Sequence, residues 1–180
     1  MPSHLIPVLI MTAGLASSAA ADTVLIGAAS GNLYAYDTDT AAVSLRTPAG
    51  PSIEAMTHIG DRLYYSDGAG LVIVLDLVTN GVVDSFTTTV DSAALATDGT
   101  WLYAGDTNGE IQQIDPSDGA VNGVATPFFG NITSLGTHWG NLYYGGLSTI
   151  AERTPMTGAF SESNFELFAV CGGAIYSMTF

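Results

Sequence analysis

Short apolar runs alternate along the chain with polar turns, as the stretch WLYAGDTNGEIQQID at 101–115 illustrates. The runs are rich in Leu, Val, Ile and Tyr, which favour strands, and the turns are rich in Gly, Asp, Asn and Ser, which tolerate positive φ or close Asx turns. Several runs are almost continuously apolar, such as LVIVLD at 71–76. Such runs are typical of strands covered on both faces. The pattern predicts an all-β chain of short strands joined by tight turns.

The pattern repeats along the chain with a nearly constant period. Four segments align, and their first residues lie 39, 39 and 40 positions apart: VLIGAASGNLYAYD (24–37), LYYSDGAGLVIVLD (63–76), LYAGDTNGEIQQID (102–115) and LYYGGLSTIAERT (142–154). A second set of related segments accompanies them: SIEAMTHIG (52–60), DSAALATDG (91–99), NITSLGTHWG (131–140) and GAIYSMTF (173–180). Each unit therefore reads as four short strands, with the turn between its second and third strands at GAASG, SDGAG, GDTNG or GGLST.

Four-stranded units of about 40 residues in tandem are the sequence signature of a β-propeller. The third unit resembles the quinoprotein-like and YVTN-type propeller repeat, approximately L-Y-x-G-x-x-x-G-x-[IV]-x-x-[IL]-D-x-x-T-G-x-V. The matching residues are Leu102, Tyr103, Gly105, Gly109, Ile111, Ile114, Asp115, Gly119 and Val121. We therefore predict a small propeller of four blades, each with four antiparallel strands. Tyr64, Tyr103 and Tyr143 recur at aligned positions, so we expect them to pack between blades.

The two ends of the repeat region supply complementary strands. Residues 22–28 read as the second strand of a unit, and residues 174–180 read as a first strand. Pairing of these two segments would complete the first blade and close the ring without a free sheet edge. We expect residues 22–180 to form one propeller domain in this way, as a monomer. A dimer whose halves form one eight-bladed ring is the alternative.

The first 21 residues have the features of a secretory signal peptide. An apolar run from Leu5 to Leu15 is followed by small residues, and Ala19 and Ala21 form an A-x-A cleavage pattern before Asp22. The sequence thus predicts a secreted or periplasmic protein. The rest of the sequence has no run of about 20 apolar residues, so we expect no membrane span.

The chain is strongly acidic, with 17 Asp and Glu residues against three arginines and no lysine, and its net charge is −14. This charge repels phosphate backbones and excludes nucleic acid as a partner. The acidic residues are spread along the chain, which fits a solvated surface, with divalent-cation binding as the competing interpretation. The single cysteine, Cys171, allows no intrachain disulfide.

The resemblance places candidate binding residues on loops at the mouth of the central channel. These residues are Asp67, Asp91, Asp106, Asn108, Glu110 and Asn131. Hairpin turns require the same residue types, so turn formation is the competing explanation. Only the third repeat carries Asp106, Asn108 and Glu110 together, and their oxygen atoms could form a weak calcium site.

Motifs for catalysis are missing. The sequence has no G-x-S-x-G elbow, and only His58 and His138 follow the first 21 residues. Trp101 and Trp139 do not reproduce the repeat motif of quinone-dependent relatives, so no cofactor is expected. The sequence favours a non-catalytic binding or interaction module for a protein, a glycan or a small molecule. The alternatives are a small propeller enzyme, a lyase or hydrolase with calcium assistance and a channel-mouth site, and a structural component of a cell-surface or extracellular assembly.

Overall fold

The computed structural model describes residues 9–10, 23–47, 50–126, 131–138, 140–153 and 165–174, with side chains described in 23–47, 50–126, 131–138 and 140–146. Every regular element in these ranges is a strand, and the strands form four antiparallel sheets. The first sheet contains β1 (Leu9–Ile10), β2 (Thr23–Gly27), β3 (Leu33–Asp37) and β4 (Val43–Thr47). The second contains β5 (Ala55–Ile59), β6 (Arg62–Ser66), β7 (Leu71–Asp76) and β8 (Val82–Thr87). The third contains β9 (Ala94–Thr97), β10 (Leu102–Gly105), β11 (Ile111–Ile114) and β12 (Val121–Ala125). The fourth contains β13 (Ile132–His138), β14 (Asn141–Arg153) and β15 (Phe165–Ala174).

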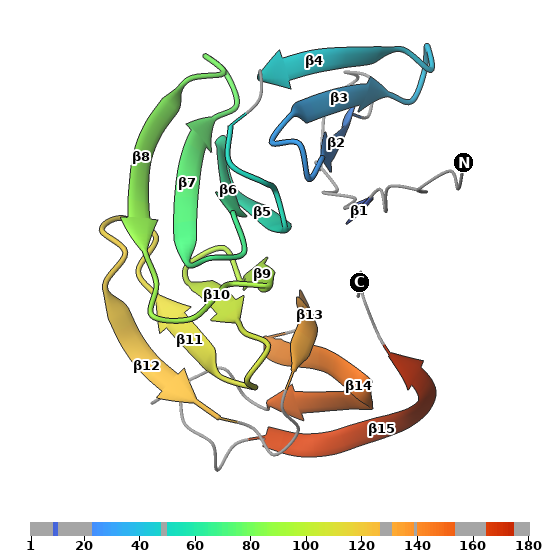
Figure 1. The fold of residues 1–180 in the computed structure, drawn as a ribbon, viewed down its shortest axis with the longest axis vertical. Helices are drawn as coiled ribbons and strands as arrows, with labels where there is room; N and C mark the ends of the chain where they lie inside the picture. Colours follow the sequence, from blue (N-terminus) through green and yellow to red (C-terminus); the bar gives the residue numbers. More distant parts are fainter. Residues whose placement is uncertain are drawn as a thin grey trace, which may run out of the picture.

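The sheets follow one another as blades along an arc (Figure 1). Inner strands β5, β9 and β13 line the inside of the arc, and outer strands β4, β8 and β12 form its circumference. Each blade runs from its inner to its outer strand in sequence order, because tight turns connect antiparallel neighbours. This arrangement confirms the predicted all-β propeller of four-stranded repeats. The predicted channel mouth corresponds to the turns that follow β2, β6 and β10.

The first blade obtains its inner strand from an unexpected segment. Leu9 and Ile10 of β1 pair with Gly27 and Ile26 of β2. These two residues lie within 1–21, the segment in which we predict a signal peptide, and both that assignment and the domain boundary stay predictions. The expected pairing of 174–180 with β2 lies outside the described residues except for Ala174, which pairs with Leu147 in the fourth sheet. Closure of the ring by this segment also stays a prediction.

The fourth repeat departs from the predicted turn at GGLST, residues 145–149. There β14 continues as one strand from Asn141 to Arg153. Its register shifts between Leu147 and Thr149, where β15 becomes the partner. The expectation of a hairpin turn at this place is wrong. The three turns that do form have a glycine with positive φ as their last residue: Gly31, Gly70 and Gly109. The aligned residue of the fourth repeat is Thr149, whose β-branched side chain disfavours positive φ and favours a strand.

The core consists of three apolar clusters, one between each pair of consecutive blades. Successive side chains of a strand point to opposite faces, so each middle strand serves two clusters. In β6, for example, Leu63 and Tyr65 face the first blade, while Tyr64 faces the third. Full burial of one such side chain contributes about 1.5–3 kcal/mol, so these clusters are the main source of stability.

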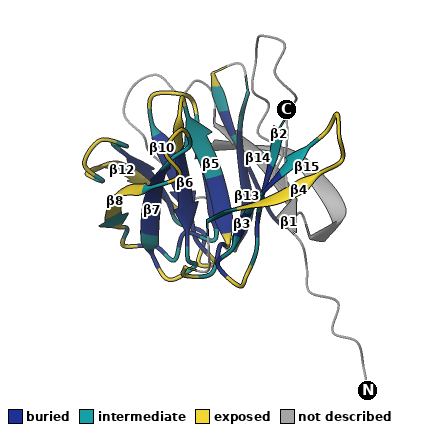
Figure 2. Ribbon diagram, turned by 90° about the horizontal axis from the view of Figure 1, so that it is seen from above, coloured by how far each residue is buried: buried dark blue, intermediate teal, exposed yellow. Residues whose placement is uncertain are grey.

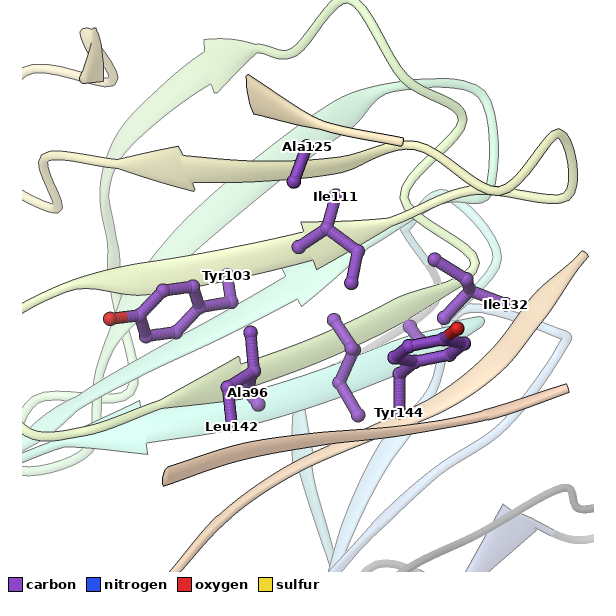
Figure 3. Packing of buried hydrophobic residues seen from close by; sticks show 9 residues of the cluster. Ala96, Tyr103, Ile111, Ala125, Ile132, Leu142 and Tyr144 are labelled. Atoms are coloured by element: carbon purple, nitrogen blue, oxygen red, sulfur yellow. The ribbon is translucent and has the colours of Figure 1, made fainter. Parts of the chain in front are cut away.

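The predicted inter-blade packing of the aligned tyrosines is confirmed for Tyr64 and Tyr103, which are buried in their clusters. Figure 3 shows the cluster in which Tyr103 of the third blade lies with Leu142 and Tyr144 of the fourth. Burial raises the pKa of Tyr144 to about 12. Tyr143 remains partly exposed.

Small residues at the end of each second strand allow the blades to approach one another. A Cβ atom on Gly27 would lie 2.4 Å from Cγ2 of Ile53, and one on Gly105 would lie 2.8 Å from Cγ2 of Ile132. The aligned Ser66 uses its hydroxyl to donate a 2.6 Å hydrogen bond to the carbonyl of Ser92. The small residue is therefore a packing requirement of the fold at this position.

Candidate functional site

Asp67 and Asp106 occupy the same position in the turns after β6 and β10. One carboxylate oxygen of Asp106 accepts hydrogen bonds from the backbone amides two and four residues ahead, at 2.9 and 2.7 Å. The corresponding oxygen of Asp67 accepts the same two bonds in its own turn, at 2.8 and 3.1 Å. Each aspartate therefore closes its hairpin, in the manner of an Asx turn.

The second oxygen of Asp106 is also used inside the turn, because it accepts a 3.1 Å hydrogen bond from the side-chain amide of Asn108. Asp106 is only 5% exposed, whereas Asn108 is exposed. A cation bound by Asp106 would compete with the hydrogen bonds that hold the turn. In the described parts of the chain, no group of three or more His, Cys, Asp or Glu residues is placed to hold a metal ion.

Asp91 lies against the same turn from the segment that precedes β9. Its carboxylate accepts hydrogen bonds from the hydroxyl of Thr107 at 2.6 Å and from the Thr107 amide at 3.2 Å. Asn131 approaches from the fourth blade, because the amide of the next residue, Ile132, donates a 2.8 Å bond to the carbonyl of Asp106. The side-chain oxygen of Asn131 is buried and has no hydrogen-bond partner in the described structure.

Glu110 connects this turn to the face between the second and third blades. One of its carboxylate oxygens accepts a 2.8 Å hydrogen bond from the side-chain amide of Gln112, which also donates to the hydroxyl of Thr89. Five of the six predicted residues thus gather around the third-blade turn, while Asp67 belongs to the turn of the second blade. The structure joins them mainly through bonds that shape the loops.

A polar chain inside the third blade was not predicted. The hydroxyl of Tyr103 donates a 2.9 Å hydrogen bond to the carboxylate of Asp98 and accepts one of 3.1 Å from the side-chain amide nitrogen of Gln113. The side-chain oxygen of Gln113 accepts a 2.7 Å bond from the side-chain amide of Asn122, so the chain reaches β12. The signal for it was present in the repeat, because Gln112 and Gln113 align with Ile73 and Val74.

The opposite ends of the blades carry a second set of aspartates that align in the repeat, Asp37, Asp76 and Asp115. Each carboxylate accepts hydrogen bonds from the turn after the third strand, such as those from the Thr79 amide at 2.7 Å and the Ser117 hydroxyl at 2.6 Å. These bonds hold the pKa of all three carboxyl groups below the ordinary value of 3.8. The aspartates recur because the turns need them as acceptors.

Exposed apolar side chains gather on the outer rim, which we define as strands β4, β8 and β12 with the turn before β8. Figure 2 shows exposed residues along β4 and in parts of β8. The large apolar residues that are 43 to 73% exposed in the described structure all lie there: Val43, Leu45, Val78, Val82, Val83, Val121 and Val124. A cavity of about 420 Å³ opens between the first and second blades beside this rim, and Tyr65, Leu71 and Val82 are among its lining residues.

These features define the chain as a β-propeller repeat protein. The family model described as "Outer membrane protein assembly factor BamB" matches residues 7–131, so the chain belongs to that family. The resemblance to quinoprotein-like propellers is therefore confirmed.

A search of curated proteins found no significant match. No helix in the described residues is long and apolar enough to cross a bilayer.

Solved structures show the same fold at low sequence identity. A chain of the "Crystal Structure of Mitotic Checkpoint Complex" is 16% identical, with a TM-score of 0.68 over 86% of this chain and 51% of that chain. A chain of the "Structure of U3-55K" is 14% identical, with a TM-score of 0.67 over 85% of this chain and 50% of that chain. The WD40 domain of Toxoplasma gondii coronin is 10% identical, with a TM-score of 0.64 over 83% of this chain and 45% of that chain. The present chain thus spans about half the length of these structures.

Proposed function

We propose that this protein is an exported, acidic interaction module that binds a partner protein through its outer rim and has no catalytic activity of its own. The observation that carries the proposal is the concentration of exposed apolar side chains on β4, β8 and β12. Exposed apolar side chains that gather on one part of a folded protein, as Val82 and Val83 do on β8, favour an interaction site there. The description of the matched family, an outer membrane protein assembly factor, supports an exported location and a role in protein assembly.

The chemistry of the rim favours an extended partner segment. Each outer strand is the edge of its sheet, and such an edge presents backbone amides and carbonyls that can pair with an added strand. Val83 and Leu45 offer apolar contacts beside these edges. The net charge of −14 disfavours an acidic partner and increases the association rate of a basic one. We therefore expect a partner segment that alternates apolar with neutral or basic residues.

The channel-mouth residues contribute less to this function than the sequence suggested. Asp67, Asp91 and Asp106 use their carboxylates to hold loops in place. Exposed Thr107 and Asn108 can still supply hydrogen bonds at the margin of a protein interface.

Site-specific photo-crosslinking in the producing cells tests the proposal. A benzoylphenylalanine residue is placed at Val83, at Leu45 and, as the matched exposed control, at Thr100 in the turn between β9 and β10. We expect the same partner protein to be captured from both rim positions and not from the control. Capture from Thr100 alone, or the absence of a common partner at the rim while folding is retained, would contradict the proposal.

A further inference from the structure

The first blade leaves partly exposed a face whose counterparts in the second and third blades are buried. Four aligned side chains of each of these two blades point to the preceding blade and are at most 7% exposed: Leu63, Tyr65, Ile73 and Leu75, and Leu102, Ala104, Gln112 and Ile114. The aligned residues of the first blade are all apolar or aromatic and partly exposed: Val24, Ile26, Tyr34 and Tyr36. We call these four residues the leading face. It has the composition of an inter-blade surface, and no described blade packs on it.

The fourth blade shows the matching asymmetry at the other end of the arc. Its Tyr143 aligns with Leu25, Tyr64 and Tyr103, which are at most 5% exposed because the next blade covers them. Tyr143 is partly exposed. We call the surface around Tyr143 the trailing face.

The three interfaces inside the chain show how such faces meet. Leu25 lies in one cluster with Leu63 and Tyr65 of the next blade. Tyr64 lies with Leu102 and Ala104. Tyr103 lies with Leu142 and Tyr144. In each case, the middle residue of one second strand meets two residues of the next second strand.

We propose that two copies of the chain join through these faces, so that the fourth blade of each copy packs on the first blade of the other. By the rule of the three internal interfaces, Tyr143 of one copy then contacts Val24 and Ile26 of the second. The two contacts are related by a two-fold axis, and together they close one eight-bladed ring. The contact continues an interface already repeated three times within the chain.

The curvature of the arc favours a second copy over the chain's own fourth blade. More than four-fifths of the chain superimposes on structures of about twice its length, with TM-scores of 0.64 to 0.68. Four blades with the tighter rotation of a four-bladed ring would not follow half of a larger ring so closely. In Figure 1 the first and fourth sheets accordingly stand at the two ends of an open arc.

Charge gives this assembly a characteristic salt dependence. Each copy carries a net charge of −14, whereas none of the four leading-face residues is charged. Long-range repulsion between the copies is screened as the Debye length falls from about 14 Å at 0.05 M salt to about 4 Å at 0.5 M salt. We expect the dimer to tighten over this range, in contrast to a contact held by surface salt bridges.

Sedimentation equilibrium of the full chain tests the proposal, with Ile26→Asp and Tyr143→Asp as disrupting variants. Ala120→Asp is the matched control, because Ala120 is exposed in a turn of the third blade. We expect the parent chain and the control to have twice the 18.5 kDa chain mass at high salt and the two variants to be folded monomers. A monomeric parent chain at all salt concentrations, or variants that remain dimers, would overturn the proposal.

A cysteine pair covers the case in which the aspartate variants fail to fold. Val24→Cys and Tyr143→Cys are combined with Cys171→Ser, which removes the natural thiol. Under oxidation we expect a covalent dimer on a non-reducing gel. A monomer with an intrachain crosslink would show that the chain's own fourth blade covers the leading face, and an uncrosslinked monomer would show that the two faces do not meet. Either monomer result rejects the proposal while leaving the rim function intact.

Discussion

The second and third blades have the same backbone register and different interiors. In the second, the centre of β7 is filled by Ile73 and Val74, which pack in apolar clusters. In the third, Gln112 and Gln113 occupy the aligned positions and are equally buried. Neighbouring groups pair with both ends of the Gln113 side-chain amide. The side-chain nitrogen of Gln112 donates two hydrogen bonds, whereas its side-chain oxygen is buried without a partner in the described structure. The difference teaches that the blade accepts a polar interior where most of its buried groups are paired, since an unpaired buried amide costs about 1–3 kcal/mol.

The largest effect is expected when the polar residue is moved without most of its partners. Val74→Gln introduces a buried amide into the second blade, where Ile59 and Val83 occupy the positions of Asp98 and Asn122. The hydroxyl of Tyr64, on the opposite strand, is the one aligned polar group that remains. We expect the free energy of unfolding to fall by about 2–4 kcal/mol, measured by urea denaturation. A loss as small as that of an exposed substitution such as Val83→Gln would show that the second blade can also satisfy the amide.

The reverse exchange removes the centre of the polar chain in the third blade. Gln113→Val leaves Asn122 and the Tyr103 hydroxyl each without one of their hydrogen bonds. We expect a loss of about 1–2 kcal/mol, smaller than for Val74→Gln because Asn122 is exposed and can turn to water. Greater stability of the variant would contradict a structural role for this chain.

The aligned tyrosines allow a finer comparison. Tyr103→Phe removes a hydroxyl that bonds to both Asp98 and Gln113, at 2.9 and 3.1 Å. The hydroxyl of Tyr64 donates a longer, 3.4 Å bond to the carbonyl of Pro116 and interacts with the side chain of Arg62. We expect Tyr103→Phe to cost about 1 kcal/mol and Tyr64→Phe clearly less. Equal losses in thermal unfolding would remove the distinction between the two blades.

The smallest effect concerns a feature that the two blades share. Asp76 and Asp115 have pKa values lowered by hydrogen bonds from Thr79 and Ser117. A lowered folded-state pKa stabilises the protein above the ordinary value of 3.8, and this contribution is lost as the pH falls through the folded-state value. Unfolding midpoints measured from about pH 5 down to pH 2 should therefore decrease, and Asp76→Asn and Asp115→Asn should each reduce the slope similarly. A steeper decrease of the unfolding midpoint with falling pH in either variant would contradict the stabilising effect of the lowered pKa values.

Much of the fold follows from the sequence because the repeat makes each strand visible several times. The 39-residue period and the alignment of Tyr64 with Tyr103 predict the blades and their packing. The continuous β14 could not be predicted from glycines alone, since Gly145 and Gly146 are compatible with both a turn and a strand. The inner strand β1 was missed because Leu9 and Ile10 lie outside the repeat.

The sequence predicted which residues form the candidate site but not that their side chains hold the turns in place. The sequence shows that only the third turn combines Asp106, Asn108 and Glu110, and the structure brings Asp91 and Asn131 to the same turn. The sequence does not show that backbone amides donate hydrogen bonds to the carboxylate of Asp106, because these bonds depend on the path of the turn itself. Nor does a sequence distinguish outer-strand valines that are exposed from inner ones that are covered.

Native-state hydrogen exchange tests the central claim, that the polar groups of the third blade are part of the frame of the propeller. The amides of β6 and β7 serve as the reference for those of β10 and β11. We predict similar free energies of exchange for the two pairs of strands, close to that of global unfolding, because the hydrogen-bonded chain through Gln113 opens only with the whole blade. Exchange of β10 and β11 through local opening at a much lower free energy would contradict the claim and would identify the third blade as a mobile site.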